Sequence, residues 1–232
     1  MEFIRTFFRD TSLILTEPRR FFRERFPTIG FSQALAFGIT AQWLASILEW
    51  LTRIVKHETL FDGINRIRES FTSLPFLKDI PDTIWNQAAP QAAPQSAWLV
   101  EVGALIVSPL QSLFMFCVSG MIFFIGGLIL ISKTPAPERD SPEPSNFIRL
   151  SAVSAAPALV GSILGFLPLN LGGFIGWVFH IVVLTLGISS RYRVSLFRAC
   201  GVIFLPGLLV LLAFGCFLAL IALGLAALFH GA

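Results

Sequence analysis

Residues 147–167 read FIRLSAVSAAPALVGSILGFL, and residues 171–189 read LGGFIGWVFHIVVLTLGIS. Each run has about 20 residues, which at about 1.5 Å of rise per residue crosses a hydrocarbon core about 30 Å thick. Lipid offers no partner for backbone N–H and C=O groups, so each run is expected to form a helix. Only Pro168, Leu169 and Asn170 separate the two runs. So short a connection predicts an antiparallel hairpin of two membrane-spanning helices.

The composition of the whole chain is typical of a membrane protein. Of its 232 residues, 55% are hydrophobic and 13% are charged, whereas soluble domains carry about 25% charged residues. The length leaves room for one membrane domain and no large soluble one. The net charge is only +3, and acids are interleaved with the arginines, so nucleic acid is not an expected partner. The predicted fold class is an all-α, polytopic membrane helical bundle.

Three further apolar runs bring the expected number of membrane-spanning helices to about five. The predicted spans are 31–52, 109–132, 147–167, 171–189 and 205–228. The apolar runs around Pro109 and Pro206 are each too long for one span. Residues 97–108 and 194–205 are therefore interpreted as interfacial helices, with parts of longer spans as the alternative. Residues 31–232 as a whole form the predicted transmembrane bundle.

Lys and Arg residues gather on one side of this five-span arrangement. That side consists of residues 1–30, 133–146 and 189–198 and holds eleven of them. On the other side, the turn 168–170 and the C-terminus hold none, and the large loop 53–108 holds five that are offset by six acids. The positive-inside rule therefore predicts a cytoplasmic N-terminus. The loop 53–108, with its own amphipathic helices, is then extracytoplasmic.

Residues 1–30 form a predicted cytoplasmic amphipathic segment that Pro18 interrupts. Its second half is the candidate surface for binding lipid or a partner, and the candidate residues are Arg19, Arg20, Phe21, Phe22, Arg23 and Arg25. Arginines among phenylalanines are typical of a helix that lies on an anionic leaflet. The alternative is that these phenylalanines pack on the protein's own transmembrane helices, because amphipathicity does not separate lipid from protein.

Glycines in the hairpin indicate how its two helices pack. Gly161 and Gly165 form one GxxxG pattern, and Gly172 and Gly176 form another. Glycine at this spacing allows close approach of helix backbones in membranes. The partner is either the neighbouring span or a second subunit, and the three-residue turn favours the neighbouring span.

A few polar residues inside the predicted spans are the remaining candidates for function. His180 lies near the middle of its span, and Gln42, Gln111 and Asn170 complete this group of intramembrane polar candidates. An ionisable side chain at that depth is either functional or a neutral imidazole that hydrogen-bonds a neighbouring Ser, Thr or carbonyl. Metalloprotease, phosphate-loop and serine-hydrolase motifs are absent from the sequence. We therefore expect no enzyme activity, no cofactor and no metal site.

Several short motifs resemble the Yip domain family, which includes bacterial members. They are Pro18 with Phe21 and Phe22, Ser108-Pro109, Gly126-Gly127, the SAAP of residues 154–157, the turn from Pro168 to Gly172, Trp177, and GISSRYRVSLFRA at residues 187–199. The resemblance implies a five-span protein of the bacterial inner (cytoplasmic) membrane. The Asp-Leu-Tyr-Gly-Pro signature of eukaryotic members is absent, so their partnership with Rab GTPases is not implied.

Two classes of function are consistent with these features. The preferred one is non-enzymatic membrane organisation, or binding of membrane lipids or a partner through the cytoplasmic amphipathic segments, with a protein partner or a homo-oligomer as further possibilities. The alternative is a transporter, channel or lipid-handling protein with a polar path near His180.

Overall fold

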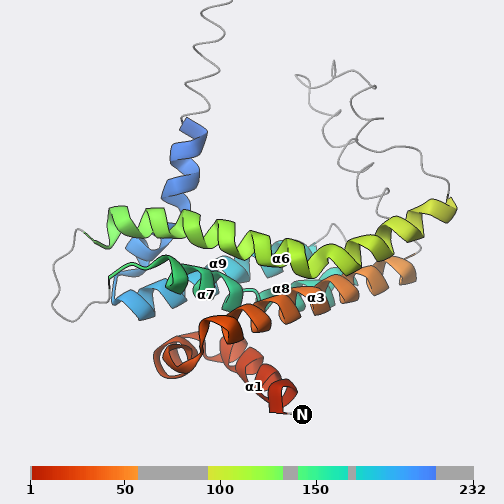
Figure 1. Cartoon of the computed structure of the whole chain (residues 1–232), viewed down its shortest axis with the longest axis horizontal. Helices are drawn as coiled ribbons and strands as arrows, with labels where there is room; N and C mark the ends of the chain where they lie inside the picture. Colours follow the sequence, from red (N-terminus) through yellow and green to blue (C-terminus); the bar gives the residue numbers. More distant parts are fainter. Residues whose placement is uncertain (1, 57–93, 133–140, 167–170, 213–232) are drawn as a thin grey trace, which may run out of the picture. The chain divides into compact units, whose positions relative to one another are not determined.

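The computed structural model describes residues 2–56, 94–132, 141–166 and 171–212, and every element in these ranges is helical (Figure 1). The elements are α1 (Glu2–Thr16), α2 (Pro18–Arg20), η1 (Phe21–Arg25), η2 (Phe26–Thr28), α3 (Phe31–Val55), α6 (Pro94–Leu130), α7 (Pro144–Val153), α8 (Pro157–Ile163), η3 (Leu164–Phe166), α9 (Leu171–Tyr192) and the helix Leu196–Leu212. The prediction of an all-α bundle is confirmed.

Four helical segments in the described ranges are long and apolar enough to cross a membrane. They are Phe31–Val55, Leu99–Leu130, Pro144–Ile163 and Leu171–Tyr192, and Leu196–Leu212 is a shorter apolar helix. The rest of the fifth predicted span, residues 213–228, lies outside the described residues, as does most of the loop 53–108. Apolar helices of this length need lipid around them, so the protein is a membrane protein.

The chain folds into two compact units. Unit 1 comprises Met1–Phe37, Phe114–Ser154 and His180–Ala232, and unit 2 comprises Gly38–Leu113 and Ala155–Phe179. The long helices α3, α6 and α9 each contribute residues to both units. The whole N-terminal segment, residues 1–30, belongs to unit 1.

In unit 2, glycines bring α8 and α9 into backbone contact. A Cβ added to Gly161 would lie 2.9 Å from the carbonyl oxygen of Gly172 and 3.0 Å from Cα of Gly176. At Gly165, by contrast, the nearest atom would be a Thr52 methyl group at an ordinary 3.7 Å. Three of the four predicted glycines therefore form the helix contact, and their partner is the neighbouring span in the same chain.

Pro109 does not end a helix, so residues 97–108 belong to a longer helix, which is the alternative given above to a separate interfacial helix before the span 109–132. α6 continues through Pro109 from Pro94 to Leu130. A proline has no N–H and leaves the carbonyl four residues earlier without its helical partner. Here that carbonyl belongs to Leu105, and it accepts a hydrogen bond from Nε1 of Trp43 on α3 (3.2 Å). The indole replaces the missing donor, and the helix continues.

Pro206 is also accommodated inside a helix, so residues 196–205 belong to a longer helix, which is the alternative given above to a separate interfacial helix 194–205. The described helix runs from Leu196 to Leu212. The carbonyl that Pro206 leaves without a helical donor is that of Val202, and Gly126 of α6 lies directly against it. A Cβ at Gly126 would overlap that oxygen and lie 3.1 Å from Cγ of Pro206. Glycine is needed here because the two helices approach so closely.

The predicted span 147–167 is interrupted. α7 ends at Val153, α8 begins at Pro157, and a short turn joins them (Figure 1). The N–H of Ala158 bonds to the carbonyl of Ala155 (2.9 Å) instead of reaching back four residues to Ser154. This tighter turn leaves the Ser154 carbonyl free for another donor.

Candidate functional site

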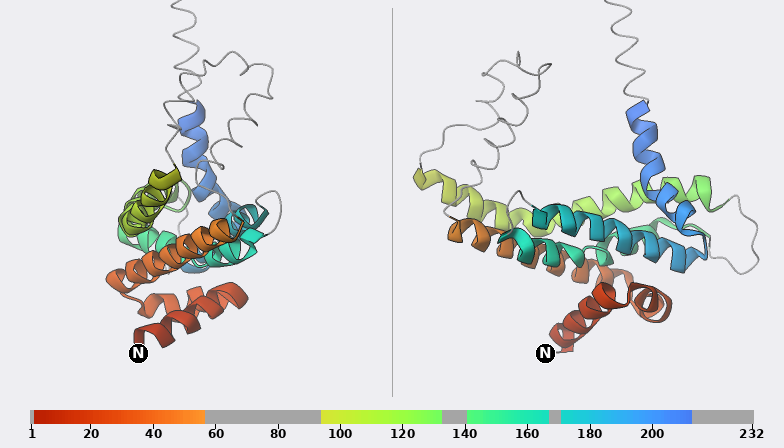
Figure 2. Two further views of the ribbon diagram at one scale, coloured as in Figure 1. Left: turned by 90° about the vertical axis from the view of Figure 1, so that its right-hand side faces the viewer. Right: turned by 180° about the vertical axis from the view of Figure 1, so that it is seen from behind.

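The N-terminal segment packs on the protein's own helices, beginning with α1. Phe7 and Ile14 are buried, and the Phe7 ring lies 5.0 Å from the ring of Phe37 on α3. Figure 2 shows α1 beside the first turns of α3. Ile4 and Phe8, in contrast, are 59% and 62% exposed. α1 therefore has one apolar side on the protein and a second apolar side that the protein leaves uncovered.

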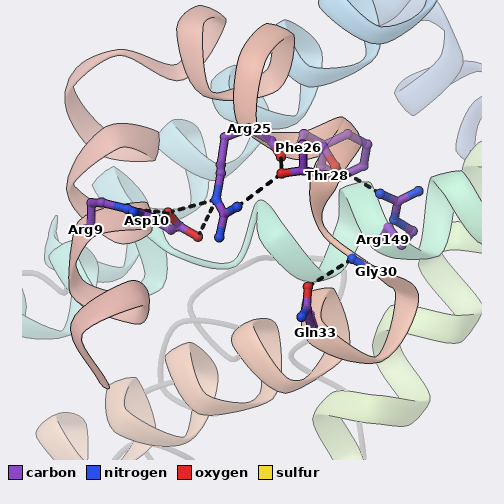
Figure 3. A network of polar contacts seen from close by, with 8 residues as sticks. All are labelled: Arg9, Asp10, Arg25, Phe26, Thr28, Gly30, Gln33 and Arg149. Carbon is purple, nitrogen blue, oxygen red and sulfur yellow. Dashed lines mark hydrogen bonds and ion pairs between the residues drawn. The ribbon is translucent and has the colours of Figure 1, made fainter. Parts of the chain in front are cut away.

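An ion pair between the buried Asp10 of α1 and the partly exposed Arg25 joins α1 to η1 (Figure 3). The Asp10 side chain is 4% exposed, and Nε of Arg25 lies 3.3 Å and 3.4 Å from its two carboxylate oxygens. Arg9 adds two contacts of 3.2 Å to the same carboxylate. Nη1 of Arg25 also donates to the Thr28 hydroxyl at 3.1 Å. A buried carboxylate needs such partners because its desolvation is costly.

Phe21 and Phe22 are buried and do not form an exposed binding surface. Each is 1% exposed, their ring centroids lie 5.3 Å apart, and Phe26 follows 5.6 Å from Phe22. The Phe22 ring fills the space beside Gly187 of α9, where an added Cβ would meet it at 2.8 Å. For these two side chains, the structure shows the alternative in which they pack on the protein's own helices.

Three of the predicted arginines lie on the surface. Arg19 and Arg23 are exposed, and Arg20 donates to Glu17 at 3.2 Å and to Glu24 at 3.1 Å. These hydrogen bonds, first of all the one to Glu24, raise the pKa of the Arg20 guanidinium above its ordinary value. Arg25, with its bond to a buried acid, is instead part of the structure that holds the segment together.

Arg149 of α7 holds the end of the N-terminal segment (Figure 3). Its Nη2 donates to the carbonyl of Phe26 at 2.9 Å and to the carbonyl of Ile29, and its Nη1 donates to Oδ1 of Asn146 at 3.0 Å. The guanidinium carbon also lies 4.6 Å from the centre of the Phe26 ring. One cation thus bonds the Ile29 carbonyl, adds a second hydrogen bond to the Phe26 carbonyl that already accepts from the Ile29 N–H, and stacks on the Phe26 ring.

His180 lies at the break between α7 and α8. Its Nδ1 is 2.6 Å from the carbonyl oxygen of Ser154, the oxygen that the tight turn leaves free. Because a carbonyl only accepts, Nδ1 carries the proton. This is the carbonyl hydrogen bond that the sequence offered as an alternative to a functional histidine. The Ser154 hydroxyl is fully buried and has no hydrogen-bond partner in the described part of the chain.

The other intramembrane candidates occupy different surroundings. Gln42 is half-buried on α3, and Gln111 is exposed on α6. Asn170 lies outside the described residues. Within the described ranges, no group of three or more His, Cys, Asp or Glu residues is placed to hold a metal ion.

Sequence reasoning missed Asp10 and the docking role of Arg149. Asp10 lies three residues after Phe7 and therefore on the side of α1 that is buried. In both cases the available signal was a charge next to buried aromatic residues.

Comparisons with protein-family models, curated proteins and solved structures found no match for this chain.

Proposed function

We propose that this protein is a non-enzymatic, multi-spanning membrane protein whose N-terminal segment binds anionic lipid or a partner. The observation that carries the proposal is the docking of this segment by Arg25 and Arg149, which leaves Arg19, Arg20 and Arg23 exposed, with Arg20 also bonded to Glu17 and Glu24. Each arginine near an anionic surface contributes about 1 kcal/mol within a Debye length. A docked segment has less conformational entropy to lose on binding than a free tail.

The proposed location is the bacterial inner membrane, with the N-terminus in the cytoplasm. The distribution of Lys and Arg supports this orientation, and the resemblance to bacterial Yip domain proteins supports the membrane and the role. Single cysteines at Ser141 and Gln91, in a chain without its native cysteines, should label from opposite sides of the membrane. Labelling of both from one side would contradict the five-span arrangement; Gln91 itself lies outside the described residues.

Lipid retention by the full chain tests the proposed function. The protein in detergent is mixed with phosphatidylglycerol or phosphatidylcholine, and native mass spectrometry counts the lipids that remain bound. We expect preferential retention of phosphatidylglycerol. Replacement of Arg19, Arg20 and Arg23 by Gln should remove the preference, and added salt should weaken it in the same way. Arg25 is left intact because it holds Asp10, and equal retention of both lipids by the unaltered chain would exclude lipid as the ligand.

The alternative, a transporter or lipid-handling protein, is supported by the interrupted span beside His180. Broken helices in membranes expose backbone carbonyls that coordinate substrates or ions in many transporters. A flux into proteoliposomes that is lost in His180→Ala, while the folded protein is retained, would favour this alternative.

A further inference from the structure

We propose that α1 lies in the boundary between headgroups and acyl chains of an anionic leaflet, with Ile4 and Phe8 inserted into the lipid. This inference rests on the proposed function and deepens it. It names the membrane-contacting face, and that face is on α1, outside the Arg19–Arg25 stretch that the sequence favoured.

Two contacts fix the rotation of α1 about its own axis. The buried Asp10 carboxylate bonds to Arg25 on one flank, and the Phe7 ring packs on Phe37 of α3. Ile14, two turns after Phe7, is completely buried. With these side chains held against unit 1, the helix is not free to roll, so the exposure of its other side chains is determined.

That fixed rotation leaves an apolar stripe uncovered. Ile4 and Phe8 are four residues apart and therefore share one side of the helix. Both are more than half exposed, and Phe3 at the start of α1 is 51% exposed. Insertion of this exposed apolar stripe into lipid is favourable because it removes apolar surface from water.

The depth of α1 agrees with lipid as the occupant. Its partner Phe37 comes six residues after the start of α3, which is about 9 Å along the helix axis. α3 is one of the candidate spans, so its first turns cross the region between headgroups and acyl chains. Helices that lie on membranes bury their apolar face about 5–10 Å deep. Contact with Phe37 places α1 at this level.

The charged side chains of α1 lie on the side of the helix away from the stripe, which faces the headgroups when Ile4 and Phe8 are inserted. Arg5 and Arg9 are both exposed and one helical turn apart. Together with Glu2 and Thr6 they line a hollow of about 440 Å³. Arg9 also contacts the Asp10 carboxylate, which Arg25 shares, so Arg5, Arg9 and Arg25 against Glu2 and Asp10 leave a net positive charge of one. Lipid phosphates therefore complement it better than the same face of a second copy, which would bring like charges together.

Labelling of the full chain in vesicles tests the inference. In a background with Ala in place of the native cysteines, Ile4→Cys and, as the matched control on the opposite side of α1, Glu2→Cys each carry an environment-sensitive fluorophore. The proteins are reconstituted into phosphatidylcholine vesicles with or without phosphatidylglycerol. A nitroxide on a shallow acyl carbon reports contact with lipid, and iodide reports contact with water.

The Ile4 label should be quenched by the lipid nitroxide at least about twofold more than the Glu2 label, since the inserted face lies about 5–10 Å deep. Removing phosphatidylglycerol or adding salt should reduce this difference. If iodide quenches the Ile4 label as strongly as the Glu2 label, the inference is overturned. An Ile4 label shielded from both quenchers would overturn it too, because protein, from a second copy or another partner, would then cover the stripe. Preferential phosphatidylglycerol retention together with a water-exposed Ile4 would leave the proposed function standing and remove only this inference.

Discussion

Arg149→Met should release the N-terminal segment from the bundle. The change removes the donors to the carbonyls of Phe26 and Ile29 and the cation over the Phe26 ring. Hydrogen bonds to a charged group contribute about 1.5–3 kcal/mol each. Taking the lower value for each carbonyl, because the guanidinium is half-buried, and adding about 0.5 kcal/mol for the cation–π contact, docking should weaken by about 3.5 kcal/mol. Arg149→Lys should weaken docking by an intermediate amount, since lysine lacks the planar fork.

Limited trypsin digestion in detergent measures the release. Cleavage after Arg19, Arg20 or Arg23 requires the segment to open locally, so its rate follows the population of the detached state. A loss of about 3.5 kcal/mol corresponds to roughly 300-fold faster cleavage at these sites. Arg5→Met, which removes an exposed arginine from the same segment, is the matched control and should leave the rate unchanged. The docking role of Arg149 would be refuted by an Arg149→Met chain that is cleaved as slowly as the unaltered chain.

The remaining predictions concern packing. Phe22→Ala should lower the free energy of unfolding by about 3–5 kcal/mol, because it leaves a cavity beside α9, measured by unfolding in mixed detergent micelles; an unchanged midpoint would show that Phe22 is not part of the core. Gly161→Ala should cost up to about 2 kcal/mol, because about 1–3 kcal/mol of overpacking against fixed backbone is offset by only about 1 kcal/mol gained in helix propensity. Gly165→Ala, with ordinary contacts, should be neutral or slightly stabilising, and equal losses at both positions would contradict the close contact between α8 and α9. His180→Leu should cost about 0.6–2 kcal/mol through the lost bond to Ser154, seen in the same assay; a more stable variant would show that the bond contributes nothing.

Pro109, Pro157 and Pro206 show which features of the helices the sequence predicts and which it does not. Hydropathy and length predicted apolar helices around each of them, and these helices are present. The residues around each proline do not reveal whether that proline ends its helix. The donor that replaces the missing bond at Pro109 is Trp43, and Trp43 reaches Leu105 across 62 positions of sequence. At Pro157 the chain turns instead, and His180 supplies a donor to the carbonyl that the turn leaves free.

The candidate site in the N-terminal segment was also predicted only in part. The sequence indicated an amphipathic N-terminal segment and identified its arginines, but it did not distinguish the side that packs on the bundle from the side that stays uncovered. Both sides are apolar, so periodicity does not separate them. Only the contacts of Phe7 and Asp10 decide which face of α1 is buried.

By itself, then, the sequence determined the helical class and the membrane, and it favoured a glycine contact within the hairpin. These follow from hydropathy, helical period and a short turn, which are all local properties. The tertiary structure decided which helices continue through proline and which way α1 faces. It also decided that Arg149 holds residues more than 100 positions away. The physical reason is that a buried polar group must find a partner, and the identity of that partner depends on which distant segment folds against it.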